Sequence, residues 1–233
     1  MEWKMEFLYD RHIDCIVCHQ PYITKKVRSR YIKTVRHDTD FCSYYENEKV
    51  NPLLYYVSVC PNCGFSASEE FSSHFPAITL QTIQTKICSN WSKQDYCDSR
   101  SFQDAINTYK LGIYSAILKK EKHITIAGLY MRLGWIYRTS LHQDEEIRFM
   151  KLALREYVNS YMKDDFKETN MSEVRLLYLI GDLNRRLKEY KQAIRYFSKV
   201  IERKKDTVEK RIVEMARERW YEIREAQKNV HTK

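Results

Sequence analysis

The chain has 233 residues, of which 43% are hydrophobic and 30% charged, a balance typical of a globular protein with a buried core. Its 18 Tyr and nine Phe exclude wholesale disorder, because disordered chains are poor in aromatic residues. No apolar run approaches the roughly 18 residues that span a bilayer. Acidic residues interrupt the first ten positions, where a secretory signal would be apolar. These features predict a cytoplasmic protein without a membrane segment.

The net charge of +9 is unevenly distributed along the chain. Residues 1–100 hold twelve basic and twelve acidic residues, whereas residues 101–233 hold 28 basic and 19 acidic residues. A basic excess suits nucleic acid, an anionic surface or an acidic protein partner, and it is equally typical of solvated helix faces. The charge therefore limits the classes of partner without choosing among them.

The first hundred residues have the pattern of strands and turns. Residues 27–35 alternate in polarity, and residues 53–59 form a β-branched and aromatic run that ends at Cys60, so both segments are predicted to be strands. Residues 66–75 and 79–91 are predicted to be short helices that connect this half to the next.

From Ser101 onward, the apolar residues recur at helical spacing. Ser101 and Asp104 have the spacing of a capping box at a helix start. Six amphipathic stripes follow, which predict three antiparallel helix hairpins. The stripes cover residues 105–116, 126–137, 147–161, 174–187, 190–201 and 208–223.

A repeat is visible within these helices. Gly134 and Gly181 stand in the spacing that tetratricopeptide (TPR) repeats use on their first helix, and Ala193 is the small residue expected on a partner helix. The two units are 47 residues apart, against 34 in a standard TPR. The pattern predicts a TPR-like array, and a generic helical bundle is the alternative.

The strongest chemical signal is a pair of CxxC motifs, Cys15 with Cys18 and Cys60 with Cys63. Two such turns supply the four thiolates that a structural zinc ion takes in a tetrahedron. Gly64 suits a tight knuckle after the second pair, because glycine adopts positive φ freely. Four cysteine ligands leave no open coordination position, so the predicted Zn²⁺ is structural and not catalytic.

Alternatives remain open at this site. Cys42 or a nearby histidine can replace one ligand, and the second motif resembles the CPxC of thiol–disulfide enzymes. The histidines concerned are His12, His19, His37 and His74. Cys88 and Cys97 are expected to be ordinary buried thiols.

Motifs of common enzyme classes are absent. The sequence has no P-loop, no dinucleotide-binding glycine fingerprint, no HExxH and no GxSxG, and its seven histidines form no recognisable catalytic set. We therefore expect that the protein is not an enzyme.

One candidate binding surface lies on the helices. The first helix of each TPR repeat lines a groove, and aligning the two units pairs Arg138 with Arg185 there. Arginine binds carboxylates bidentately, which predicts a groove for an acidic or C-terminal carboxylate of a partner. The groove residues would be Met131, Trp135, Arg138, Tyr178, Asp182, Arg185 and Arg186. Alternatively, the arginines only stabilise the helices by pairing with Asp182, Glu173 or Glu189.

The second candidate surface is the basic segment 25–37, KKVRSRYIKTVRH. A basic strand on a zinc ribbon can follow a phosphate backbone. The acidic residues that follow directly, beginning with Asp38 and Asp40, offset much of this charge. The candidate nucleic-acid contacts are Lys25, Lys26, Arg28, Arg30, Lys33 and Arg36.

Taken together, these features resemble a bacterial domain-of-unknown-function (DUF) family with an N-terminal double-CxxC module and C-terminal TPR-like helices. The segments that carry the resemblance are the first CxxC motif and residues 51–65, 131–138 and 177–201. Lys188 departs from the glycine that often stands at such a helix-hairpin turn. The resemblance covers nearly the whole chain and implies a soluble bacterial protein, without adding an activity.

The expected fold is α+β and mainly α. A zinc-ribbon-like module over residues 1–76 and a connecting helical segment over 77–100 would precede a TPR-like array over 101–233. The expected function is that of a non-enzymatic, zinc-binding adaptor or regulator that binds a protein or peptide. A nucleic-acid-binding regulator and a thiol–disulfide redox protein are the alternatives.

Overall fold

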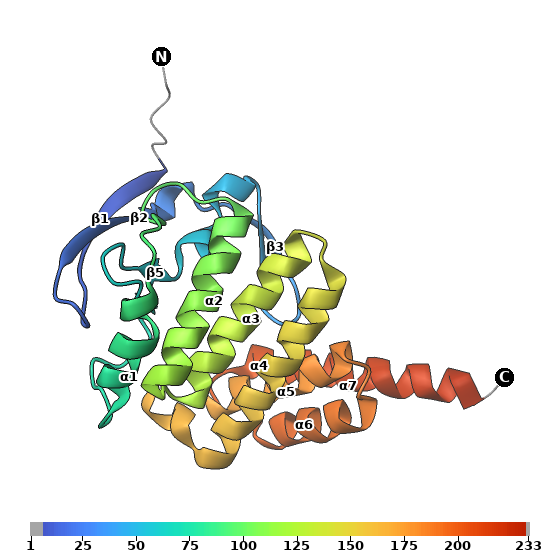
Figure 1. Cartoon of the computed structure of the whole chain (residues 1–233). Helices are drawn as coiled ribbons and strands as arrows, with labels where there is room; N and C mark the ends of the chain where they lie inside the picture. Colours follow the sequence, from blue (N-terminus) through green and yellow to red (C-terminus); the bar gives the residue numbers. More distant parts are fainter. Residues whose placement is uncertain (1–6, 232–233) are drawn as a thin grey trace.

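The computed structural model describes residues 7–231, so the expectation about the first ten residues falls largely outside the described residues. The chain is mainly helical, with small strand pairs in its first half and a helix array in its second half (Figure 1). This arrangement confirms the predicted α+β, mainly α class. Across the described residues, no helix has the length and apolar character needed to cross a membrane.

The strands of the first half form three separate two-stranded antiparallel sheets. The pairs are β1 (Leu8–Asp14) with β2 (Pro21–Val27), β3 (Thr34–His37) with β4 (Ser43–Tyr45), and β5 (Ser58–Val59) with β6 (Ser66–Ala67). The first pair is fully in register, with Leu8 opposite Val27 and Asp14 opposite Pro21. Each pair is a hairpin, so the loops between paired strands are short.

Two strand predictions are partly wrong. The segment 27–35 is interrupted by a 3₁₀ turn at Ser29–Tyr31, and the run 53–59 begins inside a 3₁₀ helix at Pro52–Tyr55. Asn51 caps this second turn with its side-chain oxygen. Proline at the first helical position and an asparagine cap favour a helix start, and here they outweigh the β propensity of the run. Only its last residues form β5.

The connecting segment contains one of the two predicted helices. Residues 79–91 form α1 (Thr79–Lys86) and a 3₁₀ turn at Cys88–Asn90, whereas residues 66–75 begin with β6 and continue without a helix. The amide of Ser72 donates to both carboxylate oxygens of buried Glu121, at 3.1 and 3.3 Å. Pairing with β5 and this contact use backbone groups that a helix would need for its own hydrogen bonds.

All six predicted helices of the second half are present. They are α2 (Phe102–Lys119), α3 (His123–Thr139), α4 (Gln143–Lys163), α5 (Glu173–Arg186), α6 (Tyr190–Glu202) and α7 (Lys210–His231). The predicted capping box starts α2, because the Asp104 amide donates to the Ser101 hydroxyl at 3.1 Å and the Ser101 amide donates to the Asp104 carboxylate at 2.9 Å. Helices α2, α3 and α4 lie side by side, and the end of α7 projects beyond its neighbours (Figure 1).

Helix α3 packs against α4, and α5 packs against α6, so each pair forms a helix hairpin. At Gly181 in α5, an added Cβ would stand 2.8 Å from the ring of Phe197 in α6. At Gly134 in α3, the nearest atoms to an added Cβ are 3.8 Å away, which is an ordinary contact. A methyl group would therefore overlap the partner helix at Gly181, whereas at Gly134 it would fit against the backbone of α4.

One apolar core extends across both halves of the chain. Buried Leu54 and Val57 belong to the same cluster as Tyr109 of α2 and Leu133 of α3. Buried Arg100 strengthens the junction, since its Nη1 donates to the backbone oxygens of Leu54 at 3.1 Å and Val57 at 2.7 Å. The strand-rich half and the helix array therefore share a core.

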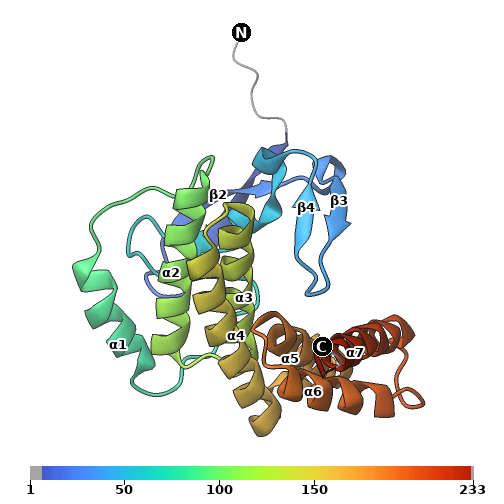
Figure 2. The same cartoon turned by 90° about the vertical axis from the view of Figure 1, so that its right-hand side faces the viewer.

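The β3–β4 hairpin reaches from the first half toward α5 and α7 (Figure 2). All four residues of β3 are exposed. The turn at its end, residues 38–41 with the sequence Asp-Thr-Asp-Phe, is here called the acidic tip. Asp40 in this tip is completely buried, which raises the question of which groups compensate its charge.

Candidate metal centre and arginine cluster

The four cysteines of the two CxxC motifs lie in two hairpin loops. Cys15 directly follows β1 and Cys18 lies in the β1–β2 loop, while Cys60 directly follows β5 and Cys63 lies in the β5–β6 loop. Their four Sγ atoms all lie within 4.8 Å of one another. The predicted cluster is confirmed, and two short hairpins position its ligands.

The two loops have the same backbone arrangement. The amide of His19 donates to the Cys15 oxygen at 2.8 Å, and the amide of Gly64 donates to the Cys60 oxygen at 2.9 Å. Both donors have a left-handed backbone, with φ of 57° at His19 and 74° at Gly64. Each cysteine pair is thus followed directly by the residue that closes its loop. His19 closes the first loop in the way that Gly64 closes the second.

The sulfur distances fit a thiolate-bound metal ion. Cys15 Sγ lies 3.6 Å from Cys63 Sγ, and Cys18 Sγ lies 3.6 Å from Cys60 Sγ. Zinc–sulfur bonds of about 2.3 Å in a tetrahedron place the sulfurs about 3.8 Å apart, whereas a disulfide holds them at about 2.05 Å. All seven cysteines are free thiols in the structure. The spacing of the four sulfurs, here called the cage, is compatible with a four-thiolate metal site.

Electrostatics also favour a cation in this cage. A hydrogen bond from Cys63 lowers the pKa of Cys15 to about 5. Burial raises the pKa of Cys60 to about 11, and the hydrogen bond to Cys15 together with burial raises the pKa of Cys63. Four thiolates at this spacing repel one another, and a bound cation is what allows all of them to ionise. Four soft sulfur donors in a tetrahedron suit zinc or iron–sulfur chemistry among the metals.

Trp91 covers the second knuckle. Its indole Nε1 donates to the Pro61 oxygen at 3.0 Å. A Cβ at Gly64 would stand 2.4 Å from the indole ring, so the knuckle and Trp91 pack without room for any other residue at that position. Sequence reasoning missed Trp91, because no motif marks a residue that contacts Pro61 and Gly64 from 30 and 27 positions away.

The alternative ligands lie elsewhere. Cys42 is buried beside the acidic tip, where its amide donates to Asp40 at 3.3 Å. Within residues 7–231, no histidine joins the sulfur cluster. Cys88 and Cys97 are half-buried rather than buried. The described cage therefore consists of the four predicted cysteines.

The thiol–disulfide interpretation receives no support from the geometry. Cys60 contacts Cys18 and Cys63 contacts Cys15, so each thiol of the CPxC-like motif contacts a thiol of the other loop. The motif also lies in a β-hairpin loop, whereas thiol–disulfide enzymes place theirs at a helix N-terminus that lowers the pKa of the attacking thiol.

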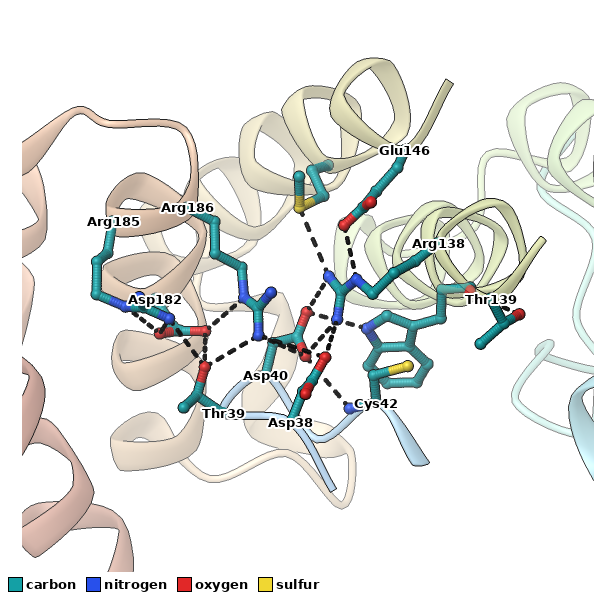
Figure 3. Close-up of polar contacts among 12 residues, drawn as sticks. Asp38, Thr39, Asp40, Cys42, Arg138, Thr139, Glu146, Asp182, Arg185 and Arg186 are labelled. Carbon is teal, nitrogen blue, oxygen red and sulfur yellow. Dashed lines mark hydrogen bonds and ion pairs between the residues drawn. The ribbon is translucent and has the colours of Figure 1, made fainter. Parts of the chain in front are cut away.

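The groove arginines converge on the acidic tip of the same chain (Figure 3). Arg138 of α3 binds Asp40 bidentately, with Nη1 at 3.0 Å and Nη2 at 2.6 Å from the two carboxylate oxygens. Its remaining donors bind Asp38 at 3.0 Å and Glu146 of α4 at 2.6 Å. Trp135 adds a hydrogen bond from Nε1 to Asp40 at 3.2 Å. These contacts compensate the buried carboxylate.

The second half of the cluster comes from α5. Arg185 and Arg186 bind Asp182 through their Nε atoms at 2.8 and 3.0 Å, and both donate to the Thr39 hydroxyl at 2.9 and 3.0 Å. Arg186 also reaches Asp40 at 3.3 Å. The Tyr178 hydroxyl donates to the Thr39 backbone oxygen at 2.8 Å. The tip is therefore held by side chains of two successive helix hairpins.

Two of the predicted groove residues are closed off from solvent. Met131 and Tyr178 are both buried. The predicted pairing of the arginines with Asp182 is present, whereas Glu173 pairs with Arg203 at 2.5 Å. Sequence reasoning did not assign Asp38 and Asp40 as the carboxylates that the arginines bind, although both were visible as acidic residues after the basic segment.

Asp40 is ionised in this environment. Burial alone would raise the pKa of Asp40, but hydrogen bonds and charge from Arg138, with a contribution from Arg186, outweigh burial and lower it. The same contacts with Asp40 and Glu146 raise the pKa of Arg138 despite its burial. The cluster is therefore a set of charged pairs at neutral pH.

The six cations of the basic segment 25–37 fall into two groups, those in ion pairs and those stacked over tyrosine rings. Four of its six cations form ion pairs, namely Lys25 with Asp10, Lys26 with Glu69, Lys33 with Glu46 and Arg36 with Asp38. In the described part of the chain, Arg28 and Arg30 form no ion pair and instead lie over the rings of Tyr9 and Tyr31, at 5.4 and 4.9 Å. Arg28 and Arg30 line a cleft of about 610 Å³ with Tyr9, Tyr55 and Tyr56, here called the basic cleft.

Comparison with known proteins gives one match. No curated protein and no solved structure is similar enough to this chain to count as a match. The model of one family, described as an uncharacterized protein conserved in bacteria (DUF2225), matches residues 8–223. This span contains both CxxC loops, the acidic tip and the arginine cluster. It covers nearly all of the chain, as the resemblance implied, and the chain therefore belongs to the DUF2225 family.

Proposed function

We propose that the protein is a non-enzymatic, zinc-binding adaptor whose helix array binds an acidic segment of a protein partner. The observation that carries this proposal is the arginine cluster. Arg138 of one helix hairpin and Arg186 of the next converge on a single buried carboxylate, Asp40. Arg138 binds this carboxylate bidentately and Arg186 adds a single contact, and such arginine contacts are the chemistry by which a groove recognises an acidic peptide.

The helix arrangement supports a TPR-like array as the scaffold for this groove. The residues that contact the acidic tip come mainly from α3 and α5, which are the first helices of the two hairpins and the helices that line the groove in TPR stacks. Close packing of Gly181 on Phe197 is the kind of small-residue contact that joins the two helices of one repeat.

Zinc would have a structural role in this adaptor. The residues that would hold it are the four thiols of the cage, and four thiolates fill every position of a tetrahedral ion. Such an ion contributes folding energy by joining two loops that share only a small apolar cluster. It supplies no reactive water, which agrees with a binding function.

The test is affinity capture from the native host, with nuclease treatment, followed by binding of the purified partner. The wild type is compared with Arg186→Ala, and Arg195→Ala is the matched control because Arg195 is exposed on α6 away from the tip. We expect a nuclease-resistant protein with an acidic segment, whose direct binding is lost in Arg186→Ala and kept in Arg195→Ala. A partner that binds all three proteins equally would contradict the proposal.

Nucleic-acid binding is the second candidate function, and the basic cleft is the observation that favours it. Arg28 and Arg30, the two cations of this lining without an ion pair among the described residues, and its three tyrosines combine phosphate contacts with surfaces for base stacking. A gel shift at low salt with a single-stranded oligonucleotide tests it. Binding should be lost in Arg28→Ala/Arg30→Ala and kept in Lys110→Ala/Lys151→Ala, which removes the same charge from exposed helix positions. Absence of wild-type binding at low salt would eliminate this candidate.

A further inference from the structure

The acidic tip lies between two clefts. The first, of about 620 Å³, lies where the tip faces α5 and α7, and its lining includes Arg175, Arg211 and Arg219 together with Glu209 and Glu218. The second, of about 660 Å³, is lined by α3 and α5 with Asp40 and Phe41, and Glu69, Glu70 and Glu168 also contribute to it. Phe41 borders both clefts. The clefts therefore leave unfilled space beside the four residues of the tip.

The hairpin that carries the tip is unsupported on one of its two strands. The β3–β4 pair joins no other sheet, and β3 is exposed over all four residues, whereas β4 is half-buried. An isolated two-stranded hairpin is marginally stable in water. The apolar part of the contact comes from half-buried Phe41, which packs on Tyr178 with ring centroids 5.6 Å apart, and from buried Cys42. The polar part consists of ion pairs and hydrogen bonds to Asp38, Thr39 and Asp40.

We propose that the acidic tip is an internal ligand that a partner's acidic segment displaces. This inference rests on the proposed adaptor function and names both the regulation of the groove and the chemistry of its partner. The tip occupies the arginines in the free protein, and the partner segment takes its place and extends into the flanking clefts. Weakly binding segments then cannot displace the tip from the groove. A partner segment that contacts the arginines better than the tip does can displace it.

The contacts of the tip define the segment that the groove recognises. A first carboxylate, at the position of Asp38, binds Arg138, and a second carboxylate two residues later lies between Arg138 and Arg186. An aromatic ring follows, at the position of Phe41, and packs on Tyr178 beneath the guanidinium of Arg175, 5.7 Å from the ring. The partner chemistry is therefore an extended acidic peptide with the pattern Asp/Glu-x-Asp/Glu-aromatic.

The experiment measures the binding of a fluorescent peptide that copies residues 36–43, with serine in place of Cys42. It compares the full-length wild type with Asp38→Asn/Asp40→Asn, whose own tip binds the arginines less well. The control Asp98→Asn/Asp206→Asn removes the same charge at exposed positions. A docked tip reduces the apparent affinity in proportion to the fraction of protein in the open state, so we expect binding at least about tenfold tighter by the tip variant. Adding Arg186→Ala should abolish this gain.

The outcomes separate the two proposals. Equal binding by the wild type and the tip variant, both dependent on Arg186, would overturn the internal-ligand inference and leave the adaptor function standing. Absence of binding by both proteins would overturn the acidic groove itself. Circular dichroism and zinc content establish that the variants are folded. If the double variant does not fold, Asp38→Asn alone serves, because its carboxylate is partly exposed, and wild-type affinity there would also overturn the inference.

Discussion

At the scale of single residues, the metal cage depends on two left-handed backbone positions. Gly64 adopts φ of 74° without strain, whereas His19 adopts φ of 57° with a side chain attached. Glycine has no Cβ to clash in this region, and histidine is among the few other residues found there. The knuckles are therefore equivalent in backbone, while the surroundings of their closing residues differ, because Trp91 covers only Gly64.

Gly64→Ala should destabilise the protein strongly. An alanine meets the left-handed backbone cost of about 1–2 kcal/mol and also overlaps the Trp91 ring, 2.4 Å from its Cβ. We expect a fall in the free energy of unfolding of more than about 2 kcal/mol in chemical denaturation. When Trp91→Ala is the reference protein, adding Gly64→Ala should lower the free energy of unfolding only by the left-handed backbone cost. Wild-type stability of the single variant would show that the knuckle is not held against Trp91.

His19→Gly should leave the metal in place. His19 lies next to Cys18 and was a candidate ligand from sequence, but its ring is outside the cluster of sulfur atoms. Glycine relieves the left-handed position, so the free energy of unfolding should stay equal or rise by up to about 1 kcal/mol. Metal content per chain, measured by mass spectrometry, should equal that of the wild type. Loss of metal would identify His19 as a ligand.

Cys60→Ser should abolish stoichiometric zinc and lower the melting temperature. The thiolate is one of four, and serine is a poor ligand for a soft site. Cys97→Ser is the matched control, since Cys97 is half-buried nearby, its thiol donates to the Val59 oxygen at 3.9 Å, and it is outside the sulfur cluster. The control should keep zinc and stability. Equal zinc content in both variants would contradict the four-thiol cage.

At the scale of elements, the six long helices could be predicted, whereas the strands could be predicted only in part and the prediction of a short helix over 66–75 was wrong. Each helix from α2 to α7 carries its own apolar stripe, and the Ser101 capping box is a local signal. The segments 27–35 and 53–59 were ambiguous because turn chemistry competes with β propensity within a few residues. At residues 66–75, the amide of Ser72 binds a carboxylate from position 121, which no local pattern reveals.

Gly181→Ala and Gly134→Ala should behave differently, although both glycines occupy the same position in the repeat pattern. A Cβ at Gly181 overlaps the Phe197 ring at 2.8 Å, so we expect a loss of about 1–3 kcal/mol from overpacking. At Gly134 the nearest atom is 3.8 Å away, so alanine should stabilise the helix by up to about 1 kcal/mol. Thermal or chemical unfolding of the two variants measures the difference. A stabilised Gly181→Ala would show that the α5–α6 contact is not close.

At the scale of the whole molecule, the cage and the arginine cluster differ in how far sequence could predict them. The cage is built from two local motifs, so the amino-acid sequence alone is enough to assign its four ligands. The cluster joins Asp40 to Arg138 and Arg186, about a hundred residues or more away. Sequence indicated arginines that would bind carboxylates, but only the fold shows that those carboxylates belong to the same chain.

Asp40→Asn should reveal the pH dependence of the contact between the halves. The pKa of Asp40 in the folded protein is lowered, so the unfolded chain, with a carboxyl pKa near 3.9, binds more protons in the intervening range. The ionised carboxylate therefore stabilises the protein above about pH 4, and this contribution disappears as the pH falls through the folded pKa. At pH 7 we expect the variant to lose about 3 kcal/mol, as when one partner of a buried pair is removed.

The measurement is urea unfolding of both proteins from pH 7 down to pH 3. The charged neighbours of Asp40, which are Asp38, Arg138, Glu146, Asp182 and Arg186, are the same in both proteins, so their titration largely cancels in the difference. The stability difference should be constant from pH 7 to about pH 5 and shrink below about pH 4. A difference that is independent of pH across the whole range would contradict an ionised Asp40.

The separation of the two sites along the chain has a consequence for biosynthesis. The cage needs only residues up to Cys63, whereas the tip contacts need the chain through Arg186. A chain made from its N-terminus thus completes the metal ligands more than a hundred residues before the last arginine emerges, and folding during synthesis proceeds in that order. Until α3 emerges, Asp38 and Asp40 have no cationic partner from α3 or α5 and stay hydrated. The four cysteines are therefore available before the tip can dock, and docking of the tip needs the chain through α5.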